Sequence, residues 1–255
     1  METVLQKVTN GVLTLTLNRP EKKNALNMEM YSKLTEGFNM ARKRDEIRVV
    51  YVNSSGSDFT SGNDLADFAA VNRGEKQLQE LPVVSFVQTV LGFPKPIVAG
   101  VSGLAVGIGT TFLLHCDAVV AGKSSQFHLA FVKLGLVPEF GSSLLFPKLA
   151  GMVRGSYYLL SGEPFGAEEA HQMGLVSHLC EDNQVDEIAR NISQRIASLP
   201  PDAVLATRKL IRSTQYYQEL VRVVEEESRL IEKQLHSEEH RKALQAFFGG
   251  GKPTP

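Results

Sequence analysis

The sequence predicts an α/β protein with a helical C-terminal region. Short β-branched or apolar segments, RVVYVN (48–53), KPIVAGVSG (95–103) and DAVVAG (117–122), alternate with glycine-containing loops and helical patterns. Segments of this kind are typical of a largely buried sheet that helices cover. Helical patterns dominate after Gly141, so the sheet is expected in the first part of the chain.

The N-terminal elements follow from periodicity. GVLTLTLNRP (11–20) alternates apolar and polar residues and ends at a proline, which predicts a strand that runs into a turn. Apolar residues at helical spacing then predict a helix over residues 28–43. The residues that carry this spacing are Met30, Tyr31, Leu34, Phe38 and Ala41. A polar connection at 71–79 precedes a further predicted helix at 81–91.

The rest of the chain contains seven more helical patterns. They cover residues 144–149, 154–160, 167–173, 185–198, 202–213, 216–235 and 238–248. SLPPDA (198–203) interrupts them, and Pro201 suits the first turn of the helix that follows. We therefore divide the chain into a core of residues 1–199 and a helical region of residues 200–255. The amphipathic faces of that region are expected to cover the core or another subunit.

Composition limits the classes of function. The chain has 255 residues, of which 43% are hydrophobic and 22% charged, as in an ordinary globular protein. The formal net charge is −1, from 27 basic and 28 acidic residues, so no overall field draws the protein to nucleic acid or to an anionic membrane. No apolar run reaches the length of a membrane span.

Cysteine usage and the two ends of the sequence bear on the compartment. Cys116 and Cys180 are too few for a disulfide framework, which favours a reducing environment. Neither cysteine has metal-ligand spacing, so no metal site is expected. The first residues lack the apolar core of a secretion signal and the last lack a peroxisomal Ser-Lys-Leu address, so a cytoplasmic location is expected.

Two glycine-containing loops are candidates for binding an oxygen anion. FTSGNDLADF (59–68) and VSGLAVGIGTTFLL (101–114) each follow a predicted strand and open a helical pattern. Backbone N–H groups at a helix start have no partner within the helix and lie at its positive end. Two such loops that face each other would aim two N–H groups at one oxygen, as an oxyanion hole does. The same glycines are equally consistent with tight turns alone.

A lone acid lies in an otherwise apolar segment, LGLVPEFGSS (134–143). Glu139 stands there between Pro138 and Phe140. Glutamate is seldom buried unless a partner or a function keeps it there. The residue is therefore either a surface turn residue or a carboxylate held in a dry pocket to move protons.

Several segments, taken together, resemble the enoyl-CoA hydratase/isomerase (crotonase) superfamily. They are NRPEKKNALN (18–27), SGNDL (61–65), KPIVAGVSGLAVGIG (95–109), CDAVVAG (116–122), FHLAFVKLGLVPEFGSS (127–143) and AHQMGLVSHL (170–179). The resemblance runs from about residue 3 to at least residue 200. It implies a spiral of repeated β-β-α units with a C-terminal helical region that mediates trimers, often stacked as dimers of trimers. It also implies an acyl-CoA thioester substrate; since coenzyme A is part of that substrate, no separate cofactor is expected.

The superfamily pattern assigns roles to single positions. Its two oxyanion-hole donors fall on the backbone N–H groups of Asn63 and Ile108. Its coenzyme A-binding region falls on Lys23, Asn24, Ala25, Leu26, Ser61 and Asp64. Backbone groups of residues 24–26 are expected to face the adenine. Lys22 or Lys23 is a candidate partner for a phosphate, although both are equally consistent with solvated surface lysines. The resemblance also suggests Phe247, Phe248 and Lys242 as contacts to a neighbouring subunit's coenzyme A, although ordinary helix packing explains the phenylalanines as well.

The acids of the pattern indicate the reaction. Hydratases of the superfamily use two glutamates to activate a water, and those positions align with Thr111 and Phe131. The peroxisomal-type Δ3,Δ2-enoyl-CoA isomerases instead carry one catalytic glutamate in the loop that aligns with Glu139. Thr111, Phe131 and Phe140 are then expected to line its pocket.

The resemblance therefore favours an isomerase that moves the double bond of 3-enoyl-CoA to give 2-trans-enoyl-CoA, in the β-oxidation of unsaturated fatty acids. One carboxylate, Glu139, would shuttle a proton from C2 to C4. Apolar neighbours would raise its pKa towards neutrality. Two alternatives stay open: an enoyl-CoA hydratase or other acyl-CoA enzyme on this scaffold, and a non-catalytic acyl-CoA-binding module.

Overall fold

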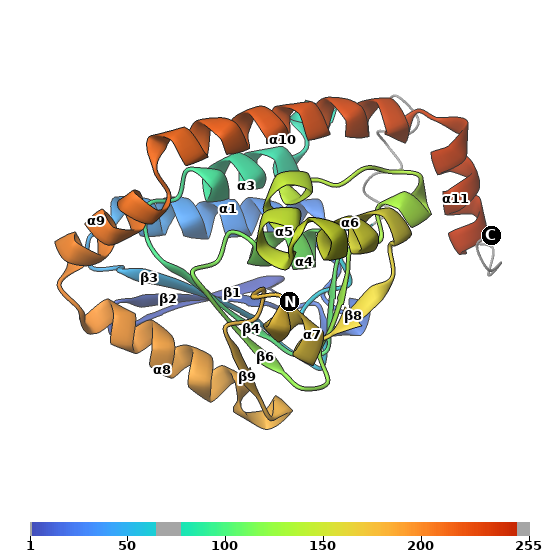
Figure 1. Ribbon diagram of the computed structural model, residues 1–255. Coiled ribbons are helices and arrows are strands. Elements are labelled where there is room, and N and C mark those ends of the chain that lie inside the picture. Colours follow the sequence, from blue (N-terminus) through green and yellow to red (C-terminus); the bar gives the residue numbers. More distant parts are fainter. Residues whose placement is uncertain (1, 65–77, 249–255) are drawn as a thin grey trace.

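A six-stranded sheet forms the centre of the molecule (Figure 1). The computed structural model describes residues 2–64 and 78–248. The strands of the sheet are β1 (Val4–Thr9), β2 (Val12–Leu17), β3 (Val49–Ser54), β4 (Ile97–Val101), β6 (Ala118–Gly122) and β9 (His178–Cys180), in the order β1-β2-β3-β4-β6-β9. The β1–β2 pair is antiparallel and every other pair is parallel. Parallel pairing requires crossovers, and helices supply them.

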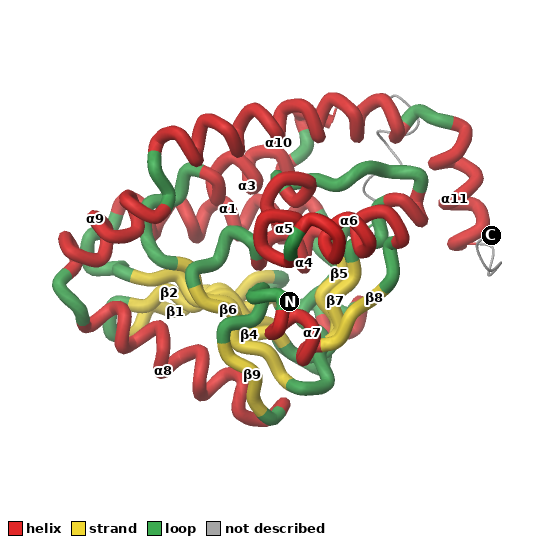
Figure 2. The backbone as a smooth tube through the Cα atoms, viewed as in Figure 1, coloured by secondary structure: helices red, strands yellow, loops and turns green. Residues whose placement is uncertain are grey.

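A second, three-stranded sheet lies beside the first (Figure 2). Its strands are β5 (Leu104–Val106), β7 (Gln126–His128) and β8 (Pro164–Gly166). The chain places β4 in the large sheet, β5 in the small one, and then enters α4 (Ile108–Leu113). It repeats this order with β6 and β7 before the next helices. The repeated unit is thus strand, strand, helix, which confirms the predicted β-β-α spiral.

Helices cover both faces of the large sheet. On one face lie α1 (Met28–Lys43), α3 (Pro82–Leu91) and, above them, α10 (Thr214–Leu235), while α8 (Val185–Ser198) covers the other face (Figure 1). The remaining helices are α5 (Ser142–Ala150), α6 (Met152–Ser161), α7 (Ala167–Gln172), α9 (Pro201–Ile211) and α11 (Glu238–Phe248). Short 3-10 turns occupy η1 (Pro20–Lys22), η2 (Leu78–Glu80), η3 (Val132–Leu134) and η4 (Asp182–Gln184).

Strand β3 shows why the sequence reads as a buried sheet. Val50 and Val52 pack into the core under α1 and α3, whereas Val49 and Tyr51 pack into the cluster under α8. Alternate side chains of a strand point to opposite faces, so a strand covered on both sides needs apolar residues at every position. Each such side chain stabilises the fold by roughly 1.5–3 kcal/mol.

Most predicted elements are confirmed, and the helix at 28–43 has the predicted bounds. Its start is fixed by Asn27, whose side chain accepts a hydrogen bond from the Met30 N–H over 2.9 Å. The structure also contains strands that the periodicity did not predict. In β1 all residues after Val4 are exposed, and β5, β7, β8 and β9 have only three residues each. The expectation that residues 101–114 form a loop before their helix was therefore wrong for Leu104–Val106.

The C-terminal helices return to the core of the same chain. Pro201 begins α9, as predicted. Arg208 of α9 donates to Asp117 Oδ2 over 2.9 Å and to Phe93 O over 2.6 Å. The division after residue 199 stays a prediction, and so does a role of residues 200–255 in assembly. The connection expected at 71–79 lies mostly outside the described residues, as do the side chains of Phe247 and Phe248.

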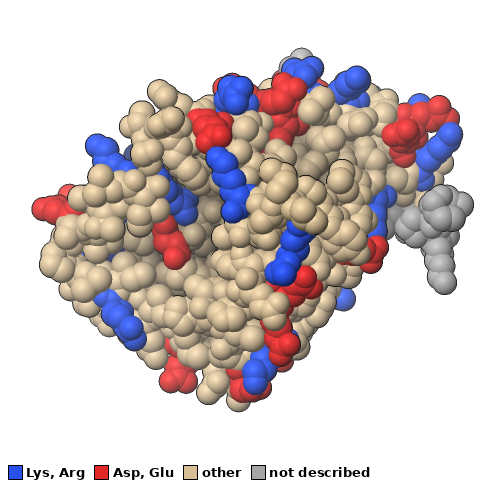
Figure 3. Space-filling view, viewed as in Figure 1, with Lys and Arg blue, Asp and Glu red and all other residues tan. Residues whose placement is uncertain are grey.

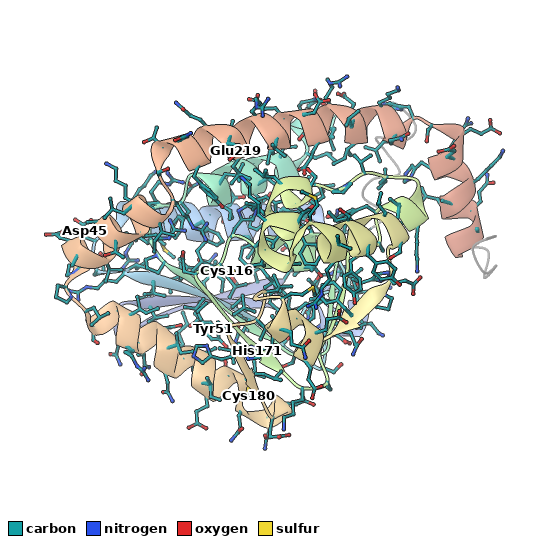
Figure 4. The ribbon with its side chains drawn as sticks, viewed as in Figure 1. Asp45, Tyr51, Cys116, His171, Cys180 and Glu219 are labelled. Atoms are coloured by element: carbon teal, nitrogen blue, oxygen red, sulfur yellow. The ribbon has the colours of Figure 1, made fainter. Side chains whose placement is uncertain are left out.

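The surface and the thiols agree with the composition. On the face seen in Figure 3, basic and acidic side chains are interspersed between broad neutral areas. Cys116 and Cys180 are free thiols on separate parts of the molecule (Figure 4). Within residues 2–64 and 78–248, no helix is long and apolar enough to cross a membrane. The same residues contain no cluster of His, Cys, Asp or Glu side chains arranged to hold a metal ion.

Candidate active site

The two glycine-containing loops lie side by side. The Thr60 N–H donates to Leu104 O over 2.9 Å, and the Val106 N–H donates to Thr60 O over 3.0 Å. Gly62 approaches the same strand so closely that a Cβ would lie 2.9 Å from Val106 O. Its φ of +90° also favours glycine strongly. These glycines therefore do what tight turns require, and they also bring the two predicted donor sites together.

The backbone around Asn63 pairs with a third segment, at Leu26, and this pairing turns the Asn63 N–H away from Leu26. The Leu26 N–H donates to Gly62 O over 2.8 Å, and the Asp64 N–H donates to Leu26 O over 2.9 Å. Both bonds use neighbours of Asn63, so its own N–H faces the opposite side. We find no hydrogen bond of this N–H to any described residue. Tyr31, which is fully buried, donates its hydroxyl to Asn63 Oδ1 and fixes the side chain.

The second donor comes from the start of α4. Gly107 is the N-cap, with φ +55° and ψ −119°, and its N–H donates to His128 O over 2.8 Å. Its carbonyl accepts from the N–H groups of Thr110 and Thr111 over 2.9 and 3.0 Å. The Ile108 N–H lies in the first turn, where the helix dipole is positive, and it has no hydrogen-bond partner within residues 2–64 and 78–248. Asn63 and Ile108 both line one cavity. That their two N–H groups share one oxygen stays a prediction.

Glu139 lines the same cavity. Its Oε1 accepts a hydrogen bond from Thr111 Oγ1 over 2.5 Å. Burial raises the pKa of Glu139 to about 8; the Thr111 hydrogen bond opposes this shift, and the negative charge of Glu227 adds to it. Glu139 is half-buried and faces the cavity, so the structure favours a pocket carboxylate over a surface turn residue.

The cavity has a volume of about 1580 Å³ and continues well beyond these groups. Apolar side chains of α3 and α10 face each other across it. They include Val83, Val84, Val87 and Leu91 on α3 and Val221, Val224, Ile231 and Leu235 on α10. A cavity of this size with a few convergent polar groups is typical of a ligand site, and it exceeds the usual range for drug-sized ligands.

The predicted pocket residues surround the carboxylate. Thr111 is fully buried and donates a hydrogen bond to Glu139, whereas the rings of Phe131 and Phe140 form part of the apolar wall of the cavity. If the resemblance holds at these positions, a hydroxyl and a phenyl ring stand where superfamily hydratases carry their glutamates. Glu139 shares the cavity with Asn63 and Ile108 and is the carboxyl group that Thr111 bonds.

The residues predicted to bind coenzyme A divide into two groups. Ala25, Ser61 and Asp64 line the cavity. Lys22 and Lys23 are exposed and are not among the residues that line the cavity, but the N–H of the lining residue Ser61 donates to Lys23 O over 2.9 Å. Lys242 of α11 also lines the cavity and pairs with Glu238 over 2.8 Å, within the same chain.

Asn24 and Leu26 have a different environment. Asn24 is fully buried with φ +52°, and its side chain bonds the backbone of Arg19, Ser55 and Asp58 over 2.7, 2.8 and 2.8 Å. Leu26 is 5% exposed, and its backbone pairs with residues 62–64. These contacts hold the donor loop, so any contact of Asn24 and Leu26 with adenine stays a prediction.

Sequence reasoning missed four residues that shape the site. Arg19 pairs with Asp64 over 3.1 Å and donates to Ala25 O over 2.7 Å, while Tyr31 orients Asn63. His115 stacks on Phe140 at 4.1 Å and donates from Nε2 to Phe140 O over 2.8 Å. Burial lowers the pKa of His115 to about 3, so it stays neutral. The fourth residue is Glu227, buried on α10; no local pattern marks any of the four.

The fold and the site define a crotonase-type protein, and comparison with known proteins agrees. The family profile for enoyl-CoA hydratase/isomerase matches residues 7–254. The chain therefore belongs to the enoyl-CoA hydratase/isomerase family and is an enzyme of that family.

Similar proteins carry several activities. The chain is 34% identical to 1,2-epoxyphenylacetyl-CoA isomerase of Escherichia coli (strain K12) over 219 residues, which cover 84% of each chain. It is 34% identical to enoyl-CoA delta isomerase 2 of Rattus norvegicus over 96% of this chain and 63% of that protein. The chain thus spans less than two thirds of that relative.

Solved structures match over nearly the whole chain. An enoyl-CoA hydratase/isomerase from Pseudoalteromonas atlantica T6c superposes with a TM-score of 0.92 at 36% identity, covering 99% of both chains. Pseudomonas aeruginosa OdaA superposes with a TM-score of 0.92 at 40% identity, covering 97% of this chain and 99% of that one. These matches confirm the predicted fold class.

Proposed function

We propose that this protein isomerises 3-enoyl-CoA to 2-trans-enoyl-CoA, with Glu139 as the proton shuttle. The observation that carries the proposal is that a half-buried carboxylate and two N–H groups without a partner among the described residues line one largely apolar cavity. The delta isomerases among its relatives support it. The reaction would serve the β-oxidation of unsaturated fatty acids.

The first step is proton abstraction. The ionised Glu139 removes a proton from C2, and the electron pair moves through the thioester to its oxygen. The N–H groups of Asn63 and Ile108 stabilise the resulting dienolate. Because these donors are fixed by backbone pairing before the substrate binds, little reorganisation is needed during the step.

The second step returns the proton. The dienolate electrons reform the carbonyl and shift the double bond to C2–C3, while C4 takes the proton that Glu139 carries. The enzyme ends in its starting protonation state, so one acid suffices. Phe131, at a hydratase glutamate position, helps to exclude water, and no metal or separate cofactor enters the proposal.

A second candidate reaction has specific support. The 1,2-epoxyphenylacetyl-CoA isomerase resembles this chain over 84% of both lengths, whereas the rat delta isomerase extends beyond it. An epoxide isomerisation would use the same donors and the same carboxylate on a different acyl group. Assaying both substrate types distinguishes the two reactions.

The test is an isomerase assay with 3-enoyl-CoA substrates of several chain lengths, run beside 2-enoyl-CoA hydration and epoxide assays. The expected result is double-bond transposition without appreciable 3-hydroxyacyl-CoA. Fast hydration would instead indicate a hydratase, and acyl-CoA binding without turnover would indicate the non-catalytic module.

Self-association as a trimer or dimer of trimers also remains a proposal, as does a cytoplasmic location. Self-association is supported by four exposed apolar side chains on α6. They are Met152, Val153, Tyr157 and Leu160, with exposed fractions of 72%, 87%, 55% and 76%. Patches of this kind often mark subunit contacts. Sedimentation equilibrium tests assembly, and a monomer at micromolar concentration would contradict it.

A further inference from the structure

The backbone just after Glu139 is held in an unusual conformation. Phe140 has φ +59° and Gly141 has φ +75°, two consecutive left-handed residues. A non-glycine residue pays a conformational cost there, so neighbouring contacts must maintain it. The Ser142 N–H donates to Glu139 O over 3.0 Å and closes the turn. The direction of the Glu139 side chain thus depends on what holds this turn in place.

Glu227 holds it from α10. Its Oε2 accepts from the Gly141 N–H over 2.6 Å, and its Oε1 accepts from the N–H and hydroxyl of Ser143 over 3.0 and 2.5 Å. The residue is 5% exposed. A carboxylate is buried at a high desolvation cost, and three donors offset that cost here.

These contacts also cap the helix that follows. Gly141 is the N-cap of α5 and has no side chain to offer, and the first turn of α5 contains no acid. Glu227 fills the missing role from 86 residues away in sequence, at the positive end of the helix. On the same face of α10, Leu220 packs so close to Gly141 that a Cβ there would lie 2.3 Å from Leu220 Cδ1.

We propose that Glu227 is a positioning residue for Glu139, through which α10 fixes the acid loop against the two oxyanion donors. The inference rests on the proposed role of Glu139 as the base. Thr111 holds the carboxylate from α4, and Glu227 holds the backbone from α10, so two elements distant in sequence fix one catalytic group. Burial is the main cause that raises the pKa of Glu139, and the negative charge of Glu227 adds to it.

The test is Glu227→Gln, assayed with 3-hexenoyl-CoA. A glutamine offers one carbonyl oxygen, and its amide group would face a donor, so the turn loses a contact. We expect kcat to fall about ten- to a hundredfold, because small displacements of a reacting group have effects of that size. KM and the affinity for unreactive hexanoyl-CoA should change less than about threefold, since the donors and the cavity wall remain.

The matched control is Glu226→Gln, the adjacent exposed residue, whose partner is Arg229 at 2.6 Å. It should retain wild-type kcat. A folded Glu227→Gln variant with kcat within about twofold of wild type would overturn the proposal. If that variant does not fold, Ser143→Ala serves instead, because it removes the hydroxyl donor and leaves the Glu227 carboxylate. An unchanged kcat of Ser143→Ala would also overturn the proposal.

A second readout separates this inference from the proposed function. Exchange of the C2 protons of 3-hexenoyl-CoA for deuterium reports the base and the donors, whether or not the double bond moves. Wild-type exchange without isomerisation rejects the proposed function but still allows Glu227 to be tested by the exchange rate. A wild-type enzyme that shows neither exchange nor isomerisation would overturn both.

Discussion

The two halves of the site are built by different means. The proposed oxyanion half consists of backbone N–H groups, held by a ladder of backbone hydrogen bonds among residues 24–26, 59–64 and 104–108. The acid half consists of one side chain, Glu139, held by contacts from α4 and α10. The first half should therefore depend on backbone geometry, and the second on side-chain chemistry at positions distant in sequence.

Gly62→Ala should break the oxyanion half. The new Cβ would lie 2.9 Å from Val106 O in a backbone with φ +90°, so the loop must move and the Asn63 N–H with it. We expect kcat/KM to fall about a hundredfold or more, the usual cost of one lost oxyanion donor. Steady-state kinetics with 3-enoyl-CoA measure this.

The control for this prediction is Asn63→Ala, which keeps the N–H and removes only the side chain that Tyr31 binds. It should lose far less activity than Gly62→Ala. Equal losses in the two variants would mean that the side chain, and not the backbone, supplies the donor.

Thr111→Val should sharpen the account of the acid half with a smaller effect. The Thr111 hydroxyl favours the ionised form of Glu139, so its removal should raise the pKa of Glu139 further above about 8. The acid limb of the kcat/KM profile should shift to higher pH, with a fall of about threefold to tenfold at pH 7. An unchanged limb would show that Glu139 is not the group that titrates.

The smallest effect is on stability. The folded-state pKa of Glu139 lies above its unfolded value, so the unfolded chain loses this proton first as pH rises from about 4.5 to about 8. Stability should decrease across that window in the wild type, and Glu139→Gln should remove this loss. We expect the variant to melt a few degrees higher, about 2–4 °C, at pH 9 and to match the wild type near pH 4. Calorimetry at the two pH values tests this, and a variant that melts lower at pH 9 would contradict it.

The sequence predicts some parts of the fold and of the site better than others. Helices with strong apolar periodicity and strands that are buried on both faces are predictable, because each pattern is repeated over several residues. The three-residue strands of the small sheet are too short to show a period, although β5 is what aligns the two donor loops. The apolar residues around Glu139 mark it as a candidate, but its role could be assigned only through the resemblance, since a lone acid in such a segment also suits a surface turn.

The supports of Glu139 lie beyond sequence reasoning for a physical reason. Glu227 occurs in the segment EEES of a long charged helix, where the sequence does not distinguish it from the neighbouring glutamates. Only tertiary packing turns its side chain towards the start of α5. Tyr31 and His115 read as ordinary helical residues for the same reason.

The most direct test of the central claim is the kcat of Glu139→Gln, measured with its affinity for hexanoyl-CoA. If Glu139 is the single proton shuttle, kcat should fall at least about a thousandfold, in the upper range for loss of a general base. The affinity should stay within about threefold, because glutamine can still accept the Thr111 hydrogen bond and the donors are untouched. A folded variant that binds normally and keeps wild-type turnover would contradict the account.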